Sequence, residues 1–537
     1  MSIVGESWLM TPLQNKLKIK LINILKLISK PQMDAFGVLF FSASSLAVRF
    51  LFGVIFLVQV GFANGHLEFN DNLKKAYKNI AQLKIEAGQT MVEKAKIDDP
   101  TNMMTYYIEN YIDFFVLFIQ ENKGEYKLRL KNKEKRLEKI QSADSSTPYY
   151  LFCQAEIMLQ WATIKMKFND KIGAASDVYS AYKILEENKR LYPSFRENDK
   201  SLSVIHALAE SLPYWVRKSF GIHGSIELAT KEISGLASYA AKTDHIFKEE
   251  IVAIYSYILF YSNNKKEEAF ALFQLYNLDY TKSPLVAFLM ATMAQKTGRN
   301  DLAIKILEQR PSSGEYLPFY YLDFMLGKFK LYRLDTDAEK HILKFINNFK
   351  GQHYIKEAYQ KLAWSRWILN KDTLGFRSYA SKCSSKGNSL IDEDKQAELE
   401  TKPDELPNEY LLKARLLYDG GYYTKAQQLL ILHASRVNSE NEMTKSEFTY
   451  RMGRVSDALK NYHDAMDYYL QTIKTGTSQT YFPCAASIYL AAIYENQNQL
   501  QKAKEYYNIA LTFHPKGYAN SLHQKAKSGI ERVSKGK

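Results

Sequence analysis

The chain has 537 residues, of which 46% are hydrophobic and 24% charged, and these proportions exclude a disordered, collagen-like or disulfide-scaffold protein. The net charge is +14, but residues 1–65 hold six basic and two acidic residues, and the remaining excess is spread along the chain without a dominant basic block. Since no recognisable DNA- or RNA-binding module accompanies this charge, we expect no nucleic-acid partner.

An apolar stretch from Ala35 to Ala63, broken by one charge at Arg49, is the first feature along the chain. Its most apolar part, Phe50 to Val60, is followed by small residues up to Gly65 and then by polar sequence with a helical pattern. This order is typical of a secretory signal peptide with its cleavage site. We therefore expect residues 1–65 to be a signal peptide or a membrane anchor.

Two interpretations of this N-terminus stay open. In the first, cleavage after Ala63 or Gly65 removes it, and translation begins at Met33, because a 65-residue signal is too long. In the second, the basic, Leu/Ile-rich segment from Lys16 to Lys30 stays in the cytoplasm and the apolar stretch anchors the protein. For a bacterial source, both place the rest of the chain in the periplasm or cell envelope.

The region 66–385 is expected to contain divergent helix pairs. Apolar residues recur there at three- and four-residue spacing, for example from Tyr106 to Gln120 and from Tyr149 to Phe168. The whole chain holds only 13 prolines and 24 glycines, which favours long helices over β-structure with many turns. A polar, net acidic segment, residues 386–406, is expected to be a linker before a last region, 407–537.

Small and aromatic residues recur at helical-repeat positions in residues 407–537. From Ser446 to Pro515 these positions are Gly453, Ala465, Tyr469, Leu490, Ala491, Tyr494, Ala503, Tyr507, Ala510 and Pro515, and Ala414 and Ala426 continue the pattern upstream. The pattern resembles the 34-residue tetratricopeptide repeat (TPR). In such repeats small residues let two antiparallel helices approach closely, aromatic rings fill the space beside them, and proline ends the second helix. The resemblance implies an all-α superhelix, a TPR-like solenoid, with Ala519 to Val533 as its capping helix.

A second resemblance begins in the segment from Ser201 to Leu236. It has a Ser-Leu-Pro step, a hydrophobic helix, Phe220-Gly221 and Gly224. Together with the helical region and the terminal repeats, it is similar to the eukaryotic TPR family that includes inclusion-body clearance proteins of the mitochondrial outer membrane. This resemblance covers residues 145–515 and implies no catalytic residues.

Motifs for catalysis or cofactor binding are missing from the sequence. We find no Gly-rich phosphate loop, no Gly-x-Ser-x-Gly turn and no His-Glu-x-x-His. The ten histidines are scattered, and Cys153, Cys383 and Cys484 lie far apart without metal-ligand spacing. We therefore expect no enzymatic activity, cofactor or metal. The alternative is a helical-repeat ligand carrier or enzyme, with an unrecognised site in the aromatic-rich region 100–220.

The function expected from these features is that of a non-catalytic scaffold, exported or membrane-anchored, which binds a peptide or a partner helix in the concave groove of the solenoid. A TPR adaptor anchored on an organelle surface and facing the cytosol is a further alternative. Tyrosine and arginine are frequent anchors of protein interfaces. The residues expected to bind the partner are Asn408, Arg415, Tyr418, Tyr450, Arg454 and Asn496.

Overall fold

A computed structural model describes residues 65–534 except 211, 213–216, 219, 438, 439 and 479. The expected signal peptide or anchor at 1–65 lies outside these residues, apart from Gly65. The described part is all-α, as expected, with only isolated β-bridges such as that between Gly65 and Ala143. Within it, no helix has the length and apolar character needed to cross a membrane.

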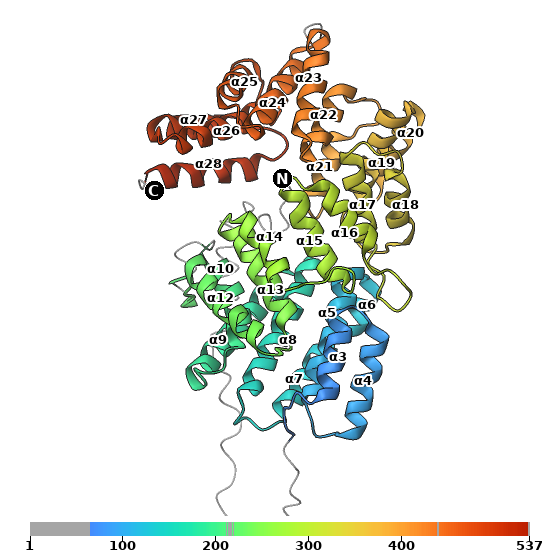
Figure 1. Cartoon of the computed structure of the whole chain (residues 1–537), viewed down its shortest axis with the longest axis vertical. Helices are drawn as coiled ribbons and strands as arrows, with labels where there is room; N and C mark the ends of the chain where they lie inside the picture. Colours follow the sequence, from blue (N-terminus) through green and yellow to red (C-terminus); the bar gives the residue numbers. More distant parts are fainter. Residues whose placement is uncertain are drawn as a thin grey trace, which may run out of the picture.

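The helices of the N-terminal half cover one shared core (Figure 1, blue to green). Several begin at polar caps; for example, the side chain of Asn70 accepts a hydrogen bond from the amide of Leu73, and Thr147 precedes Pro148 at the first helical position. The helices are α3 (Asp71–Ala81), α4 (Ile85–Asp98), α5 (Met104–Gln120), α6 (Lys123–Arg129), α7 (Asn132–Gln141), α8 (Pro148–Lys167), α9 (Lys171–Leu191), α10 (Asn198–Ala209), α12 (Ile226–Lys242), α13 (Lys248–Tyr257), the π-helix η1 (Ile258–Ser262) and α14 (Lys266–Leu275).

Two further groups of helices complete the chain (Figure 1, yellow to red). The middle group contains α15 (Pro284–Lys296), α16 (Asn300–Gln309), α17 (Tyr321–Tyr332), α18 (Ala338–Asn348), α19 (Ile355–Asn370), α20 (Thr373–Ser385) and α21 (Asp392–Glu400). The C-terminal group contains α22 (Glu409–Asp419), α23 (Tyr423–Val437), α24 (Glu442–Ala458), α25 (Tyr462–Thr475), α26 (Phe482–Asn496), α27 (Leu500–Thr512) and α28 (Ala519–Ser534).

One turn geometry recurs from the first helix pair to the last. At ten connections between the helices given above, a residue adopts the left-handed conformation, and the amide of the next residue donates to a carbonyl in the last turn of the preceding helix. The left-handed residues are Leu83, Asn169, Asn264, Asn277, Gly298, Leu334, Lys371, Gly421, Lys460 and Asn498. The shared turn shows that helical hairpins are the repeating unit in the divergent region 66–385 as well as in 407–537.

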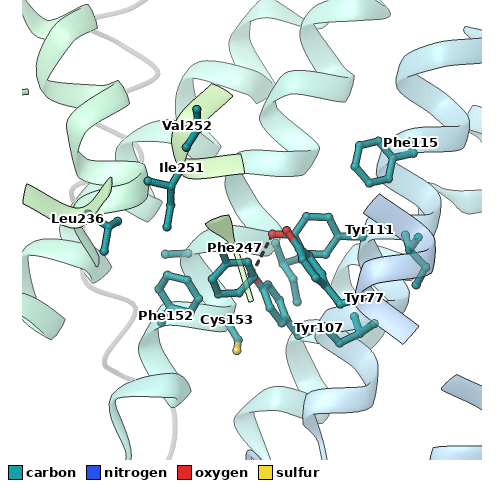
Figure 2. Packing of buried hydrophobic residues seen from close by; sticks show 14 of the residues in the cluster. Tyr77, Tyr107, Tyr111, Phe115, Phe152, Cys153, Leu236, Phe247, Ile251 and Val252 are labelled. Atoms are coloured by element: carbon teal, nitrogen blue, oxygen red, sulfur yellow. Dashed lines mark hydrogen bonds between the residues drawn. The ribbon is translucent and has the colours of Figure 1, made fainter. Parts of the chain in front are cut away.

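Aromatic rings from several helices form the core of the N-terminal half. Figure 2 shows Tyr77 of α3, Tyr107 and Tyr111 of α5, Phe152 of α8 and Phe247 just before α13 pointing toward one another. Tyr77 meets Tyr111 and Phe247 edge to face, with ring centroids 5.2 and 5.1 Å apart. Edge-to-face contacts stabilise aromatic clusters beyond the gain from burial alone. Much of the tyrosine in this half is therefore structural.

A buried carboxylate joins the N-terminal half to the middle group. Glu121 follows α5, is 4% exposed, and accepts hydrogen bonds from the amides of Gln352 and His353 at 3.2 and 3.1 Å. It also pairs with Lys167 at 2.7 Å and with the His353 ring at 2.8 Å. Burial would raise its pKa, but Lys167 and His353 hold the pKa of Glu121 at about 2.

The segment 386–406, where the sequence suggested a polar linker, contains helix α21, which packs on α19. Its acidic residues have a structural use that composition alone does not reveal. The side chain of Asp394 is fully buried and accepts hydrogen bonds from the amides of Tyr354 and Glu357, at 2.7 and 3.0 Å, at the start of α19. A carboxylate at a helix N-terminus satisfies free amides and interacts well with the helix dipole.

The C-terminal helices form three successive pairs and a final helix, α28, which packs on α26 and α27. The small and aromatic residues noted in the sequence lie between the paired helices, and tyrosine rings pack against glycines: a Cβ atom on Gly453 would come within 2.6 Å of Tyr469. The buried positions are Ala414, Ala426, Gly453, Ala465, Tyr469, Leu490, Ala491, Tyr494, Ala503, Tyr507, Ala510 and Pro515.

Candidate functional site

The first helices of successive pairs form a continuous inner layer in the C-terminal part of the molecule. Helix α17 contacts α19 and α22, α22 contacts α24, and α24 contacts α26. Helix α23 packs against α22 and α24, and α25 packs against α24 and α26. Side chains that project from α17, α19, α22, α24 and α26 therefore share one surface, which we call the inner face.

The central feature of the inner face is an arginine surrounded by tyrosine rings. The Arg454 guanidinium on α24 lies 3.9 Å from the ring centroid of Tyr489 on α26 and 4.8 Å from that of Tyr418 on α22. It donates hydrogen bonds to the hydroxyls of Tyr418 at 2.7 Å and Tyr450 at 3.2 Å. We call these four residues the Arg454 cage. It links the first helices of three successive pairs.

The charge of Arg454 has no carboxylate in contact. Among the described residues, none of the ion pairs within 4 Å involves Arg454. The acidic residue that acts on it through space, Asp457, accepts a hydrogen bond from the Tyr469 hydroxyl at 3.2 Å instead. Arg454, Tyr418 and Tyr489 are each half-buried. The cage is thus a partly accessible cationic position with aromatic walls.

A second cationic group lies around Trp364 on α19. The Lys361 ammonium is 4.0 Å from the Trp364 ring centroid, and the Arg415 guanidinium of α22 is 5.0 Å from it. Arg415 pairs with Glu400 at 2.9 Å, whereas Lys361 lies 3.8 Å from Glu357. Burial lowers the pKa of Lys361 to about 8, although Glu357 raises it.

Tyr481 connects the two cationic groups. Its ring meets Tyr450 of the cage edge to face, with centroids 5.7 Å apart, and meets Tyr518 at 5.0 Å. Burial raises the pKa of Tyr481, and the charge of Arg415 acts on the same hydroxyl in the opposite direction. The cage and the Trp364 group therefore belong to one surface, rich in tyrosine and arginine.

The six residues expected to bind a partner do not all share one position. Tyr418, Tyr450 and Arg454 come together in the cage, and Arg415 lies beside Trp364. Asn408 caps α22, because its side-chain oxygen accepts hydrogen bonds from the amides of Tyr410 and Leu411. Asn496 is exposed at the end of α26.

Sequence reasoning missed Tyr489, Trp364 and Lys361 as members of this surface. A signal for Tyr489 exists in the spacing from the recurrent turns: Tyr418, Arg454 and Tyr489 precede the left-handed residues Gly421, Lys460 and Asn498 by three, six and nine positions. From one helix pair to the next, the residue that faces the cage therefore lies about one helical turn farther from the turn that ends its helix. Without the turns, whose residue types differ, this register could not be found.

The aromatic-rich region 100–220 contains a different cluster around a buried lysine. Lys200 of α10 is 1% exposed and pairs with Glu156 at 2.5 Å and with Glu250 at 2.8 Å. Glu250 also accepts hydrogen bonds from the hydroxyls of Tyr77 and Tyr111, at 3.0 and 3.1 Å. Burial alone would lower the pKa of Lys200, but the two carboxylates raise it. The cluster ties α3, α5, α8, α10 and α13 together.

Metal-binding groups are not found in the described part of the chain, where no three His, Cys, Asp or Glu side chains are placed to hold an ion. Cys153, Cys383 and Cys484 are buried and unpaired with one another. Burial raises the pKa of the Cys383 and Cys484 thiols to about 12. Thiols of this kind are poor nucleophiles at neutral pH.

No protein-family model matches the chain, and no curated protein is similar to it. Similar solved structures include Naa15/Naa10 bound to HypK-THB (13% identity, TM-score 0.25, 86% of this chain and 66% of that chain) and the human IFIT1 dimer with m7Gppp-AAAA (13%, 0.29, 87% and 96%). The APC/C hetero-tetramer Cut9-Hcn1 is another (10%, 0.25, 85% and 95%). These TM-scores are too low to place the chain in a family. Its helical-repeat architecture rests on its own helix pairs and turns, and the resemblance to the inclusion-body clearance family stays a prediction.

Proposed function

We propose that this protein is a non-catalytic scaffold that binds a peptide or helix of a protein partner along the inner face. The observation that supports the proposal is the Arg454 cage, in which a half-buried arginine is held among tyrosines from three successive first helices. Large rigid aromatic residues and arginine are the side chains that contribute most to protein interfaces. Helical solenoids commonly bind extended or helical segments on such a face.

The alternative of an enzyme or ligand carrier in the region 100–220 receives less support. The charged groups there face one another: Lys200 is paired with two carboxylates, and the phenols of Tyr77 and Tyr111 donate to Glu250. A catalytic or binding group needs unsatisfied donors or acceptors that can reach a substrate. We therefore assign the Lys200 cluster a role in folding stability.

Peptide selection on the full chain tests the proposal. A display library of 12-residue protein segments is selected on the wild-type chain, and the selected peptides are measured against Tyr489→Ala. We expect at least a tenfold weaker affinity for the variant, because a central aromatic anchor contributes on the order of 2 kcal/mol.

Arg436→Gln is the matched control for this selection. Arg436 also stacks on a tyrosine, 5.4 Å from the Tyr410 ring centroid, and donates to its hydroxyl at 2.6 Å, but on the exposed side of α23. The Arg436→Gln variant should bind the selected peptides as tightly as the wild type does. Failure to select any peptide, or equal binding by Tyr489→Ala, would contradict the proposed function.

We further propose that residues 1–65 export this scaffold or anchor it in a cell envelope. The support is the apolar stretch from Ala35 to Ala63 with its flanking basic and small residues. N-terminal sequencing of the native protein, combined with protease protection in fractionated cells, tests it. A start beyond Ala63 supports cleavage, whereas an intact N-terminus with the repeats exposed to the cytosol favours the organelle-surface adaptor.

A further inference from the structure

We infer that the Arg454 cage recognises an acidic side chain, Asp or Glu, of the bound protein segment. This inference rests on the proposed function and specifies the chemistry of the partner.

The lysines and arginines that are fully buried in the described chain each have a carboxylate within 4 Å. Arg136 pairs with Asp113 at 2.5 Å, Lys133 with Asp177 at 2.6 Å, and Lys330 with Asp337 at 2.7 Å. A charge that is removed from water without a counter-ion is strongly unfavourable, so native proteins pair such groups. Arg454 is half-buried between three tyrosines and has no such carboxylate in the described chain, and a carboxylate from a partner would supply one.

The cage presents several hydrogen-bond donors in one place. A guanidinium has five N–H donors, and Arg454 directs two of them to the hydroxyls of Tyr418 and Tyr450. Both hydroxyls act as acceptors there, so each keeps its own proton to donate. Guanidinium and phenol donors together match the oxygens of a carboxylate, and hydrogen bonds between charged groups are roughly twice as strong as neutral ones.

The charges around the cage favour a single carboxylate over the phosphate backbone of a nucleic acid. Arg415 is paired with Glu400, Arg451 with Glu447, and Lys328 and Lys361 with Glu357. A nucleic acid is bound by a groove with several free cations along the backbone. On this face the paired carboxylates would repel a polyanion, whereas a protein segment can place one acidic residue at the cage and neutral residues elsewhere.

A positional-scanning library of 12-residue peptides tests the inference on the full chain. Each position is fixed in turn as Asp, Glu, Asn, Gln, Lys or Leu, and binding is compared between the wild type, Arg454→Gln and the control Arg436→Gln. We expect at least one position at which Asp or Glu binds tenfold or more better than its amide. This preference should vanish in Arg454→Gln and persist in Arg436→Gln.

A second variant covers the case in which Arg454→Gln alters the fold. Tyr418→Phe keeps the ring and removes one hydroxyl of the cage, and it should reduce the preference for acid over amide severalfold. Thermal unfolding of each variant identifies loss of structure.

The outcomes separate this inference from the proposed function. Peptides that bind through Tyr489 with no preference for Asp or Glu would overturn the inference and leave the scaffold proposal standing. If no peptide binds, both are overturned. A 12-residue oligouridine that binds in an Arg454-dependent way, in place of the peptides, would assign the cage to phosphate and also overturn both.

Discussion

Two cations in this molecule are surrounded by tyrosine, and they differ in what neutralises them. Lys200, in the N-terminal half, is 1% exposed and lies between the carboxylates of Glu156 and Glu250. Arg454, in the C-terminal half, is half-buried and has hydroxyls and ring faces around it, with no carboxylate of the described chain within ion-pair distance. The cation of the first cluster is paired with carboxylates, whereas the cation of the second has no carboxylate partner in the described chain.

This difference separates a structural cluster from a binding surface more clearly than residue type does. Both clusters contain tyrosine hydroxyls and a stacked cation: Lys200 lies 4.6 Å from the Phe247 ring centroid, and Arg454 lies 3.9 Å from that of Tyr489. Around Lys200 the donors and acceptors satisfy each other, and removal of one leaves a buried charge alone. Around Arg454 the missing partner is an anion.

The largest effect is expected for Lys200→Met. The substitution leaves Glu156, which is 3% exposed, without its cation, and breaking a buried pair in this way costs about 3–5 kcal/mol. Urea unfolding of the full chain should show this loss in the free energy of unfolding. The triple variant Lys200→Met, Glu156→Leu, Glu250→Gln should recover most of it, because it removes the unpaired charges as well. A single variant as stable as the wild type would show that the cluster is not structural.

Glu121, which joins the N-terminal half to the middle group, should behave as a buried, paired carboxylate like those of the Lys200 cluster. Its pKa of about 2 lies below the ordinary value of 4.5. A lowered carboxyl pKa stabilises the fold above the unfolded value, and this contribution is lost as the pH falls from 4.5 to 2. The shift corresponds to about 3 kcal/mol. Other carboxylates titrate in the same range, so the measurement is the difference between wild type and Glu121→Gln in urea unfolding at pH 6 and pH 3. A difference independent of pH would contradict the pairing.

The sequence was sufficient to predict an all-α chain, and the small residues and tyrosines of 407–537 that follow a known spacing are buried in the structure. The sequence could not place the turns of the divergent region, since the left-handed position is held by residues as different as Leu83, Asn169 and Lys371. The helical hairpin of this region is defined by the backbone hydrogen bonds of its turn, which the sequence does not reveal. The acidic stretch at Asp394 suggested a linker for a similar reason, because its polarity is used to cap α19.

The candidate site was predictable only in part. Tyrosine and arginine on the expected first helices predict Tyr418, Tyr450 and Arg454 as binding residues, and in the structure these three side chains meet in the cage. Whether a polar residue is free depends on tertiary contacts: Asn408 is used as a helix cap, and Arg415 meets Glu400 from a helix that the sequence did not predict. The lack of a carboxylate at Arg454 is likewise a property of packing.

Lys361 provides a stability test on the inner face itself. Its pKa of about 8 lies below the ordinary value of 10.5, because burial outweighs Glu357 and Glu400, while Arg415 and Lys328 add repulsion. The folded state therefore binds this proton more weakly than the unfolded state does. At pH 7 the charged lysine lowers the free energy of unfolding by up to about 3 kcal/mol. This penalty disappears as the pH rises from 8 to 10.5, because the lysine is then neutral in the folded state and its deprotonation costs less free energy as the pH rises. Lys361→Met should raise the free energy of unfolding at pH 7 by somewhat less than this penalty, because the side-chain oxygen of Gln360 loses the hydrogen bond that Lys361 donates. Equal stability gains at pH 7 and pH 10.5 would contradict this origin.

The smallest stability effect is expected for Arg454→Gln, and there the contrast with Lys200 is sharpest. The substitution removes two hydrogen bonds to neutral hydroxyls and a stacked guanidinium, but it also removes a half-buried charge that no carboxylate of the described chain contacts. Loss of the hydrogen bonds and of the stacking destabilises the fold, whereas loss of the unpaired charge stabilises it. The free energy of unfolding should therefore change by no more than about 1 kcal/mol. The same variant should lose the preference for acidic peptides, whereas Lys200→Met, measured below its unfolding transition, should keep it. A loss of several kcal/mol in Arg454→Gln would mean that the cage holds the repeats together as Lys200 holds the N-terminal half, and its role would then be structural.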